Sequence, residues 1–352
     1  MKRVLLPAVR ALDSAAASLA LMLRWERPAL LSFMFHGLFA DRAEAEGGLV
    51  DPYQPLTVAD FRSFLEAFLA AGYRFIRPDD LLADPDPEGR YALVTFDDGY
   101  ANNLRLPALL RAFQVPATVF ITAENLAAGK AFWWDVLFRE LRRRGTAPGQ
   151  MTAQREQLKR LSPREIEASL VRMFGAEALR PAGEVDRPMT LDELRDFARE
   201  PLISLGNHSL DHALLDRCDE REIERQIFGC QDFLERITGQ RPEIIAYPNG
   251  NYDSRVLRVA RAAGLRLGLT VESRKAPLPL DADALLALPR FMLTGGPSMA
   301  AQFRQCRSDL QLLNGLKRVV RGRKQAGLAA NAAAATAPAA SRARGGAGRA
   351  GR

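Results

Sequence analysis

The sequence predicts one large α/β domain, on three observations. Apolar stretches at residues 29–35, 92–96 and 117–121 have the length and the β-branched or aromatic content of buried strands. Segments with helical character separate these stretches, which gives the strand–helix–strand rhythm of a parallel sheet. A chain of 352 residues, 47% of them hydrophobic and 26% charged, is also long enough to bury an ample core.

Residues 1–28 precede the first strand and are predicted to form a helical segment. They begin with basic residues and contain an apolar run at 15–23, but Arg10 and Asp13 interrupt, and no small-residue cleavage site follows. A secretory signal is therefore disfavoured, and the apolar run is too short to cross a bilayer. A helix packed on the domain or lying on a membrane face fits as well. We favour a cytoplasmic protein, with a secreted or membrane-peripheral one as the alternatives.

The first strand, residues 29–35, delivers His36 to its carboxyl end. After a polar loop, Thr57 and Asp60 have the spacing of a capping box and open a helix that ends at Gly72. The central strand follows, and after it come a helix near residues 104–113 and a strand at residues 117–121.

The central strand, residues 92–96, runs directly into Asp97, Asp98 and Gly99. Neighbouring side chains at a strand end point in different directions, so the two carboxylates can hold different roles. Both stay ionised in a dry pocket only if a cation or hydrogen bonds compensate them; a divalent metal on one and a cationic side chain beside the other would do so. An isolated Asp-Asp-Gly is typical of a solvated turn, so the metal interpretation depends on residues further along.

Residues 123–200 interrupt the strand–helix rhythm, and we interpret them as a helical insertion. Its first part contains Phe132, Trp133 and Trp134 in a row. This aromatic trio is either a surface on which a sugar stacks or packing beneath the inserted helices.

The strand pattern resumes at residues 202–206 and is followed at once by His208 and His212. A later strand leads to a tight turn that contains Asn249, and the last strand delivers Arg290. Each of these polar residues therefore lies at or just past the end of a predicted strand.

The net charge of +7 comes from the C-terminal end of the chain and not from the predicted domain. From residue 317 onward there are nine cations and no acid; without them, 40 of the 49 Lys and Arg remain against 42 acids. The predicted domain therefore has no basic surface of the kind that binds nucleic acid. We expect residues 296–324 to form a C-terminal helical segment, and the Ala/Gly/Arg-rich residues 325–352 to be disordered.

The two later histidines indicate a metal site. His208 and His212 are four residues apart, a spacing that one helical turn converts into two imidazoles on one face. Two histidines and one carboxylate form a three-ligand site with an open position for water, which is typical of a catalytic zinc. Ser209 stands where the HExxH protease pattern has its glutamate, so a base must come from elsewhere, and the Asp97/Asp98 pair supplies one ligand and one base.

These motifs resemble those of the polysaccharide deacetylase family (NodB homology, carbohydrate esterase family 4). Residues 95–99 resemble its first motif, and residues 208–212 resemble its metal-binding HSxxH motif. Residues 246–250 resemble its third motif, and residues 288–290 resemble the segment that carries a later arginine in one branch. The resemblance spans about residues 29–295, apart from the insertion.

The resemblance implies a distorted (β/α)7 barrel whose strands end at the active site. It implies that Asp98, His208 and His212 hold one divalent ion: zinc first, with cobalt, nickel or another transition metal as alternatives. Asp97 would take a proton from the water bound to that ion, and this water would attack an acetamide carbonyl. The backbone N–H of Asn249 would help to hold the resulting oxyanion.

The chain departs from the common family pattern at two places. Many members have an arginine in the third motif that steadies the catalytic Asp; Ala246 occupies that position here, and Arg290 is the candidate replacement. The late Leu-x-His motif that supplies the general acid is absent, since no histidine follows His212. Some branches carry an aromatic-His pair ahead of the Asp pair, which residues 35–36 resemble, so His36 is the candidate acid, with packing as the alternative role.

Four functions compete on this evidence. The first is a metal-dependent hydrolase that removes N-acetyl groups from an amino sugar in a polysaccharide or glycan precursor. The second is a carbohydrate O-acetyl esterase with the same metal site, and the third is an inactive glycan-binding relative, which the presence of base and ligands argues against. The fourth, an iron oxygenase with two histidines and one carboxylate, is disfavoured because it leaves Asp97 without a task. The expected partner in the first three is a carbohydrate.

Overall fold

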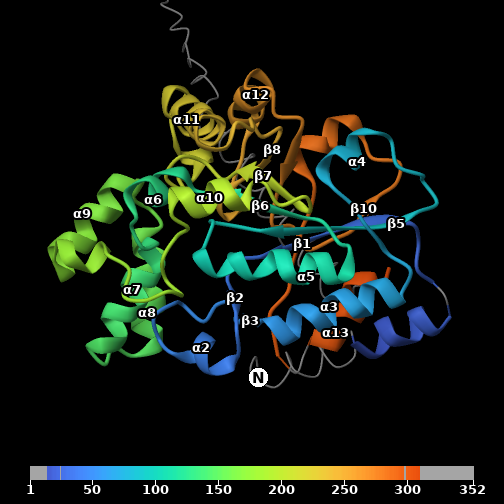
Figure 1. Cartoon of the computed structure of the whole chain (residues 1–352), viewed down its shortest axis with the longest axis horizontal. Helices are drawn as coiled ribbons and strands as arrows, with labels where there is room; N and C mark the ends of the chain where they lie inside the picture. Colours follow the sequence, from blue (N-terminus) through green and yellow to red (C-terminus); the bar gives the residue numbers. More distant parts are fainter. Residues whose placement is uncertain (1–13, 24, 297–298, 310–352) are drawn as a thin grey trace, which may run out of the picture.

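The computed structural model describes residues 14–23, 25–296 and 299–309 (Figure 1). Its centre is a nine-stranded sheet with the order β10-β1-β5-β6-β7-β8-β9, in which β11 also pairs with β1 and β4 with β5. All of these pairs are parallel except β1 with β10. The strands of this sheet are β1 (Ala29–Phe35), β4 (Arg74–Phe75), β5 (Arg90–Phe96), β6 (Ala117–Ile121), β7 (Ile203–Asn207), β8 (Ile244–Ala246), β9 (Leu267–Leu269), β10 (Ala276–Pro277) and β11 (Phe291–Met292).

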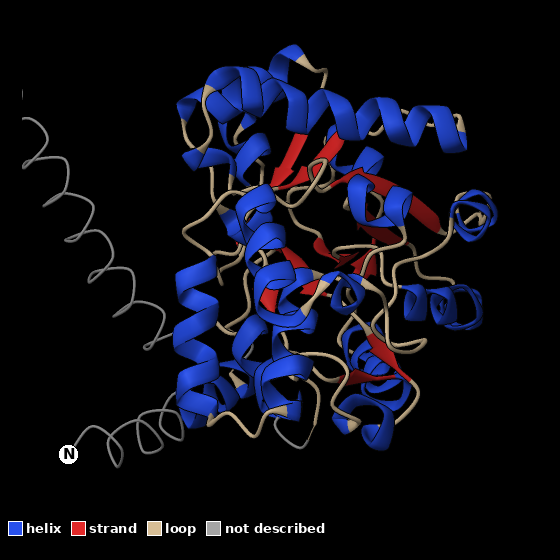
Figure 2. Cartoon of the chain, turned by 90° about the vertical axis from the view of Figure 1, so that its left-hand side faces the viewer, coloured by secondary structure: helices blue, strands red, loops and turns tan. Residues whose placement is uncertain are grey.

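Helices surround the strands, which lie in the middle of the molecule (Figure 2). A small second sheet pairs β2 with β3 in parallel. The elements outside the main sheet and the insertion are β2 (Leu38–Phe39), α2 (Arg42–Glu46), β3 (Leu56–Thr57), α3 (Val58–Ala70), α4 (Pro78–Leu82), α5 (Leu106–Phe113), α11 (Glu220–Thr238), α12 (Ser254–Ala262) and α13 (Met299–Arg307).

The two ends of the sheet approach each other through residues 288–292. Leu288 forms an isolated parallel bridge with Leu269 of β9, and β11 pairs in parallel with β1. The sheet therefore curls until its two ends are joined by one short segment. The predicted fold class, a mixed α/β fold with a distorted barrel, is confirmed.

A cluster of phenylalanines packs α3 against β1. Phe33 and Phe35 of β1 make edge contacts with Phe64, at ring-centroid distances of 4.9 and 5.4 Å. All three rings are fully buried. The helix begins at the capping box predicted from Thr57 and Asp60, which the structure confirms. This packing fixes β1, the strand that carries His36 at its end.

Residues 123–200 contain a group of helices that leaves the sheet after β6 and returns at β7. Arg139 ties this group together: its buried guanidinium binds Asp186 and donates to the backbone oxygens of Ala178 and Arg180. A buried arginine needs such a full set of acceptors. The helices are α6 (Ala123–Ala128), α7 (Trp133–Arg143), α8 (Pro148–Leu158), α9 (Pro163–Phe174) and α10 (Leu191–Phe197).

The terminal predictions fall only partly within the described residues. Residues 14–22 are helical, and α13 lies in the segment 296–324. Residues 297–298 and 310–324 of that segment, and the stretch 325–352, which was predicted to be disordered, lie outside the described residues. No helix among the residues that the structure describes has the length and hydropathy needed to cross a membrane.

Candidate active site

Asp97 and Asp98 lie at the carboxyl end of β5 and have different backbone conformations. The Asp97 N–H donates to the Phe35 oxygen at 2.8 Å, which continues the strand pairing with β1. Asp98 has φ +78° and Gly99 has φ +87°, so the chain leaves the sheet in a left-handed turn. A Cβ at position 99 would also lie 2.9 Å from the Ile121 side chain. The turn separates the two carboxylates, as predicted.

The loop after β7 brings His208 and His212 together, but not by a helical turn. Residues 208–212 are not helical; Ser209 and His212 have φ of +64° and +57°. The predicted helical turn is therefore wrong, although the spacing does place both rings on one side, with centroids 4.9 Å apart. The loop is held because the Gln226 side chain accepts from two of its backbone N–H groups, at 3.0 and 3.1 Å.

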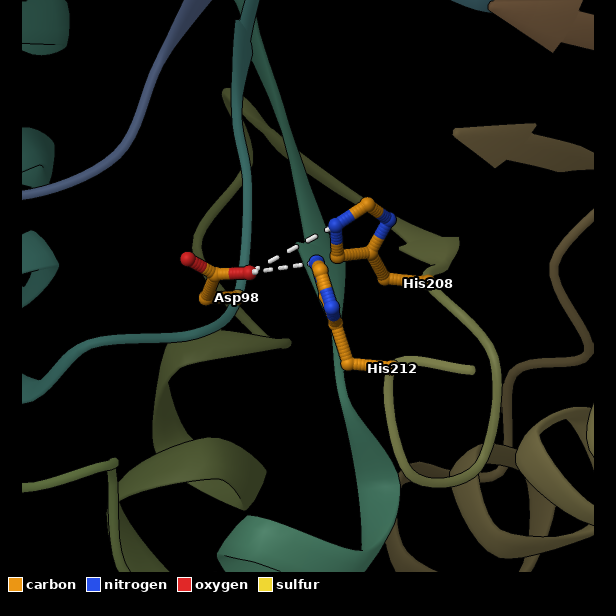
Figure 3. Close-up of side chains that lie close together, drawn as sticks. All are labelled: Asp98, His208 and His212. Carbon is orange, nitrogen blue, oxygen red and sulfur yellow. Dashed lines mark ion pairs between the residues drawn. The ribbon is translucent and has the colours of Figure 1, made fainter. Parts of the chain in front are cut away.

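Asp98, His208 and His212 converge on one point (Figure 3). Oδ1 of Asp98 lies 3.5 Å from His208 Nε2 and 3.7 Å from His212 Nε2, and the three potential ligand atoms lie within 4.8 Å of one another. His208 Nδ1 is 2.7 Å from the Ala246 oxygen, which can only accept, so Nδ1 carries a proton and Nε2 is the ring nitrogen that faces Asp98.

This arrangement fits a bound cation. Asp98 is fully buried, and neither of its carboxylate oxygens has a hydrogen-bond partner in the described part of the chain. Burial is the main cause that lowers the pKa of His212, to about 4, so its imidazole is neutral at physiological pH. A carboxylate and two imidazole lone pairs facing one another repel unless a positive ion lies between them, and this donor set suits zinc and other transition metals.

Arg290 binds the second carboxylate of the pair. Its guanidinium donates to both oxygens of Asp97, at 2.7 and 2.9 Å. Nη1 also donates to Thr95 Oγ1, and Nε donates to the Thr270 oxygen. Both side chains of the ion pair are buried. Burial on its own would raise the pKa of Asp97, but Arg290 and the nearby imidazoles outweigh it and lower this pKa to about 2. Asp97 is therefore ionised throughout the physiological range.

His36 is held by a residue that the sequence did not single out. Its Nδ1 lies 2.6 Å from Oε1 of Gln54. The Gln54 amide nitrogen donates to the backbone oxygens of Met34 and Leu293, at 2.7 and 2.5 Å, which fixes the orientation of the amide. Because Oε1 can only accept, His36 carries a proton on Nδ1, and its Nε2 is the nitrogen left for other partners.

Asn249 lies in a short 3-10 turn, residues 248–250, that follows β8. It has φ +55°, and its side chain donates to Asn251 Oδ1 at 2.8 Å. It lines the same cavity as the Asp pair and His36. The structure therefore brings every candidate site residue from the sequence to one place, with Arg290 behind Asp97.

That cavity has a volume of about 600 Å³, and the insertion supplies one of its walls. Trp134 lies 4.7 Å, between ring centroids, from His212. Phe132 is fully buried and stacks on Trp134 at 5.2 Å. Of the two roles open for the aromatic trio, Phe132 is packing, whereas Trp133 and Trp134 line the cavity.

Trp134 is oriented by a buried polar chain that sequence analysis also missed. Its Nε1–H donates to the Tyr100 hydroxyl at 2.8 Å, and that hydroxyl lies 2.6 Å from Oδ2 of Asp135. The Asp51 N–H donates to the other oxygen of Asp135 at 2.8 Å. Burial, aided by the nearby charges of Asp51 and Asp98, raises the pKa of Asp135 to about 8 despite these bonds.

Comparison with known proteins agrees with this fold and shows the family. The family model described as polysaccharide deacetylase matches residues 84–190 and 183–268, which together make up more than half of the chain. The protein therefore belongs to the polysaccharide deacetylase family, a family of metal-dependent hydrolases. It is 19% identical over 247 residues to the Bacillus subtilis protein named Putative polysaccharide deacetylase YxkH, covering 69% of this chain and 67% of that one.

Two solved structures support the fold. The Streptococcus pyogenes deacetylase PplD, solved in complex with acetate, superposes with a TM-score of 0.54 at 17% identity, covering 80% of this chain and 99% of that one. The protein IcaB from Ammonifex degensii gives a TM-score of 0.51 at 18% identity, covering 80% of this chain and 98% of that one.

Proposed function

We propose that this protein is a metal-dependent N-deacetylase that removes acetyl groups from an amino sugar in a polysaccharide or glycan precursor. The observation that carries the proposal is the convergence of Asp98, His208 and His212 beside an ionised Asp97. The buried Asp98 oxygens have no hydrogen-bond partner among the described residues. Membership of the polysaccharide deacetylase family supports a carbohydrate substrate.

In this proposal the three converging residues hold one divalent ion, with zinc as the first candidate. Three protein ligands leave at least one position open. When bound, the ion raises the acidity of a water molecule and polarises the carbonyl of the acetyl group. Trp134, beside His212, forms the cavity wall nearest the ligands and narrows the space in which the acyl group can lie.

Asp97 is the proposed general base. Arg290 uses both oxygens of the carboxylate, which fixes the carboxylate plane, and each oxygen keeps a further lone pair for a water proton. A pKa of about 2 keeps Asp97 ionised but makes it a weak base, so its contribution depends on its position and on the acidity of the water it faces.

His36 is the proposed general acid. An amine leaves a tetrahedral intermediate only after its nitrogen is protonated, and His36 is the one histidine of the chain outside the proposed ligand set. Gln54 accepts from Nδ1, so Nε2 is the position that would carry the transferable proton. The backbone N–H of Asn249, in the turn beside the cavity, is the proposed oxyanion donor.

Acetate release tests the proposal. The purified protein is incubated with a panel of N-acetyl amino sugars, polymeric and soluble, and with O-acetylated sugars, before and after treatment with a chelator and after addition of zinc, cobalt or nickel. We expect metal-dependent release of acetate from an N-acetylated substrate. Release from O-acetyl substrates alone would identify an esterase, and glycan binding without release at any metal would identify an inactive relative.

A further inference from the structure

The helix at residues 14–22 exposes its large apolar side chains and buries its small ones. A helix that only packs on its own domain does the reverse. Ala17 and Ala20 are completely buried, whereas Leu19 and Met22 are 55% and 80% exposed. The next residues continue the pattern, with Leu23 at 50% and Trp25 at 58% exposure. Small side chains face the protein and large apolar ones face outward, although burial favours the reverse. We call Leu19, Met22, Leu23 and Trp25 the outward apolar face.

The outward apolar face lies at the end of the barrel opposite the active site. Glu26, one residue after it, accepts from Tyr73 and binds Arg307 and Arg90. Arg90 is the first residue of β5, and Glu26 itself precedes β1. The candidate catalytic residues lie at the carboxyl ends of those same two strands, so the outward apolar face and the cavity are separated by the length of the sheet.

The charges near the outward apolar face are mainly positive. The described acids near it are paired, and many cations follow in the sequence. Residues 14–23 contain no charged residue. Asp13 directly precedes the helix in the sequence and lies outside the described residues, whereas Glu26 and Asp309 are paired with Arg307 and Lys275. Asp309 also accepts from the Arg27 N–H, so the described chain ends beside this face, and residues 310–352 add nine cations and no acid.

We propose that the outward apolar face docks on the surface of an anionic lipid membrane. Leucine, methionine and tryptophan side chains enter the boundary between headgroups and acyl chains, and neighbouring lysines and arginines are attracted to anionic headgroups. The nine cations that follow Asp309 in the sequence favour this occupant over a second copy of the chain, because two copies would bring like charges together. Docking leaves the mouth of the cavity open, because the active site lies at the other end of the strands.

Sedimentation with lipid vesicles tests the proposal on the full chain. The protein is mixed with vesicles of phosphatidylcholine alone and of phosphatidylcholine with phosphatidylglycerol, at low and high salt. We expect binding to the anionic vesicles that weakens with salt. The double variant Leu19→Gln/Met22→Gln should bind them at least about tenfold more weakly, since it removes two of the four apolar contacts.

A matched control separates this face from exposed apolar groups in general. Leu104 and Met173 are exposed elsewhere, at 36% and 37%, and the variant Leu104→Gln/Met173→Gln should bind anionic vesicles like the parent protein. Both variants should melt near the parent temperature, because all four side chains are exposed. The proposal is wrong if the parent protein ignores anionic vesicles, or if Leu19→Gln/Met22→Gln binds them equally well. A third result would also refute the proposal. The parent protein would form dimers in analytical ultracentrifugation, whereas Leu19→Gln/Met22→Gln would be a monomer that still binds anionic vesicles.

Discussion

Arg290 binds Asp97 through two parallel hydrogen bonds, from a position 193 residues further along the chain. We expect Arg290 to take the place of an arginine that many family members carry in the third motif, where this chain has Ala246. Arg290 directly precedes β11, which pairs with β1. It therefore reaches the Asp97 carboxylate from a different strand than the third motif. This geometry gives the first of five predictions.

Arg290→Met should destabilise the protein by about 3–5 kcal/mol near neutral pH, because it leaves a buried carboxylate without its partner. The pKa of Asp97 falls from 3.8 to about 2 in the folded protein, so the stability it contributes is present above 3.8 and lost as the pH falls toward 2. The deficit of the variant should therefore shrink on acidification. Urea unfolding over a pH series measures this deficit. Arg258→Met, which breaks an exposed pair with Glu220, should cost less than about 1 kcal/mol and serves as the control.

Asp98→Asn and His208→Ala should each abolish tight binding of one divalent ion, because each removes one of three protein ligands. Metal content after dialysis, measured by atomic emission, provides the test. Asp97→Asn is the matched control: it should keep the ion yet lose about 10²–10⁴ in turnover as the base is removed. Full occupancy in the first two variants would refute the site, and metal loss in Asp97→Asn alone would exchange the two roles.

His36→Gln should keep the fold and the ion but lower turnover of an acetamide by about 10²–10⁴. The same change should affect an activated ester far less, because its leaving group departs without a proton. The measurement is the turnover rate of the parent and of the variant on the acetamide and on the activated ester. Equal losses on both would assign His36 a positioning role, and unchanged rates would make it a packing residue.

Gln54→Met should allow the His36 ring to change its tautomer, because it removes the only acceptor fixed on Nδ1. In the parent protein, ¹⁵N spectra should show the Nδ1-protonated form of His36, and in the variant a mixture. Turnover of an acetamide should fall about tenfold with metal content unchanged. An Nε2-protonated His36 in the parent protein would contradict the assignment.

Asp135→Asn should stabilise the protein increasingly as the pH rises. The pKa of Asp135 rises from 3.8 to about 8 on folding, so its contribution to stability is present below 3.8 and is lost as the pH rises through 8. Asparagine is neutral like the protonated carboxyl and does not titrate. The stability difference should therefore grow by at most about 1.4 kcal/mol per pH unit between these values and then level off. Melting temperatures across this range test it; a constant difference would show that Asp135 is ionised throughout.

The strand ends could be predicted from the sequence because strand patterns are local. A buried strand is a short apolar run, and a polar residue directly after it lies at the edge of the sheet, which is how His36, Asp97 and His208 were found. The family motifs then indicated which of these residues share a site. These residues could therefore be predicted because the local strand pattern and the family motifs were used together.

The missed features depend on contacts between distant segments. Gln54 lies in a polar loop without a motif, and its role comes from Met34 and from Leu293, 239 residues away. The pairing of Asp135 with Tyr100 joins the insertion to the turn after β5, which no periodicity can reveal. The conformation of residues 208–212 was predicted wrongly because four-residue spacing fits both a helical turn and a loop held by Gln226.

Because β1 pairs with both β5 and β11, the groups proposed to move protons are mounted on adjacent strands of one rigid frame. His36 follows β1, Asp97 follows β5 and Arg290 precedes β11. Trp133 and Trp134, which line the cavity, belong to the insertion at residues 123–200. The buried ion pair of Arg139 and Asp186 holds this insertion together. The insertion meets this frame where Tyr100 contacts Asp135 and where His212 contacts Trp134. Substitutions in the insertion away from these two contacts can therefore change the shape of the cavity while leaving the strands that carry His36 and Asp97 in place.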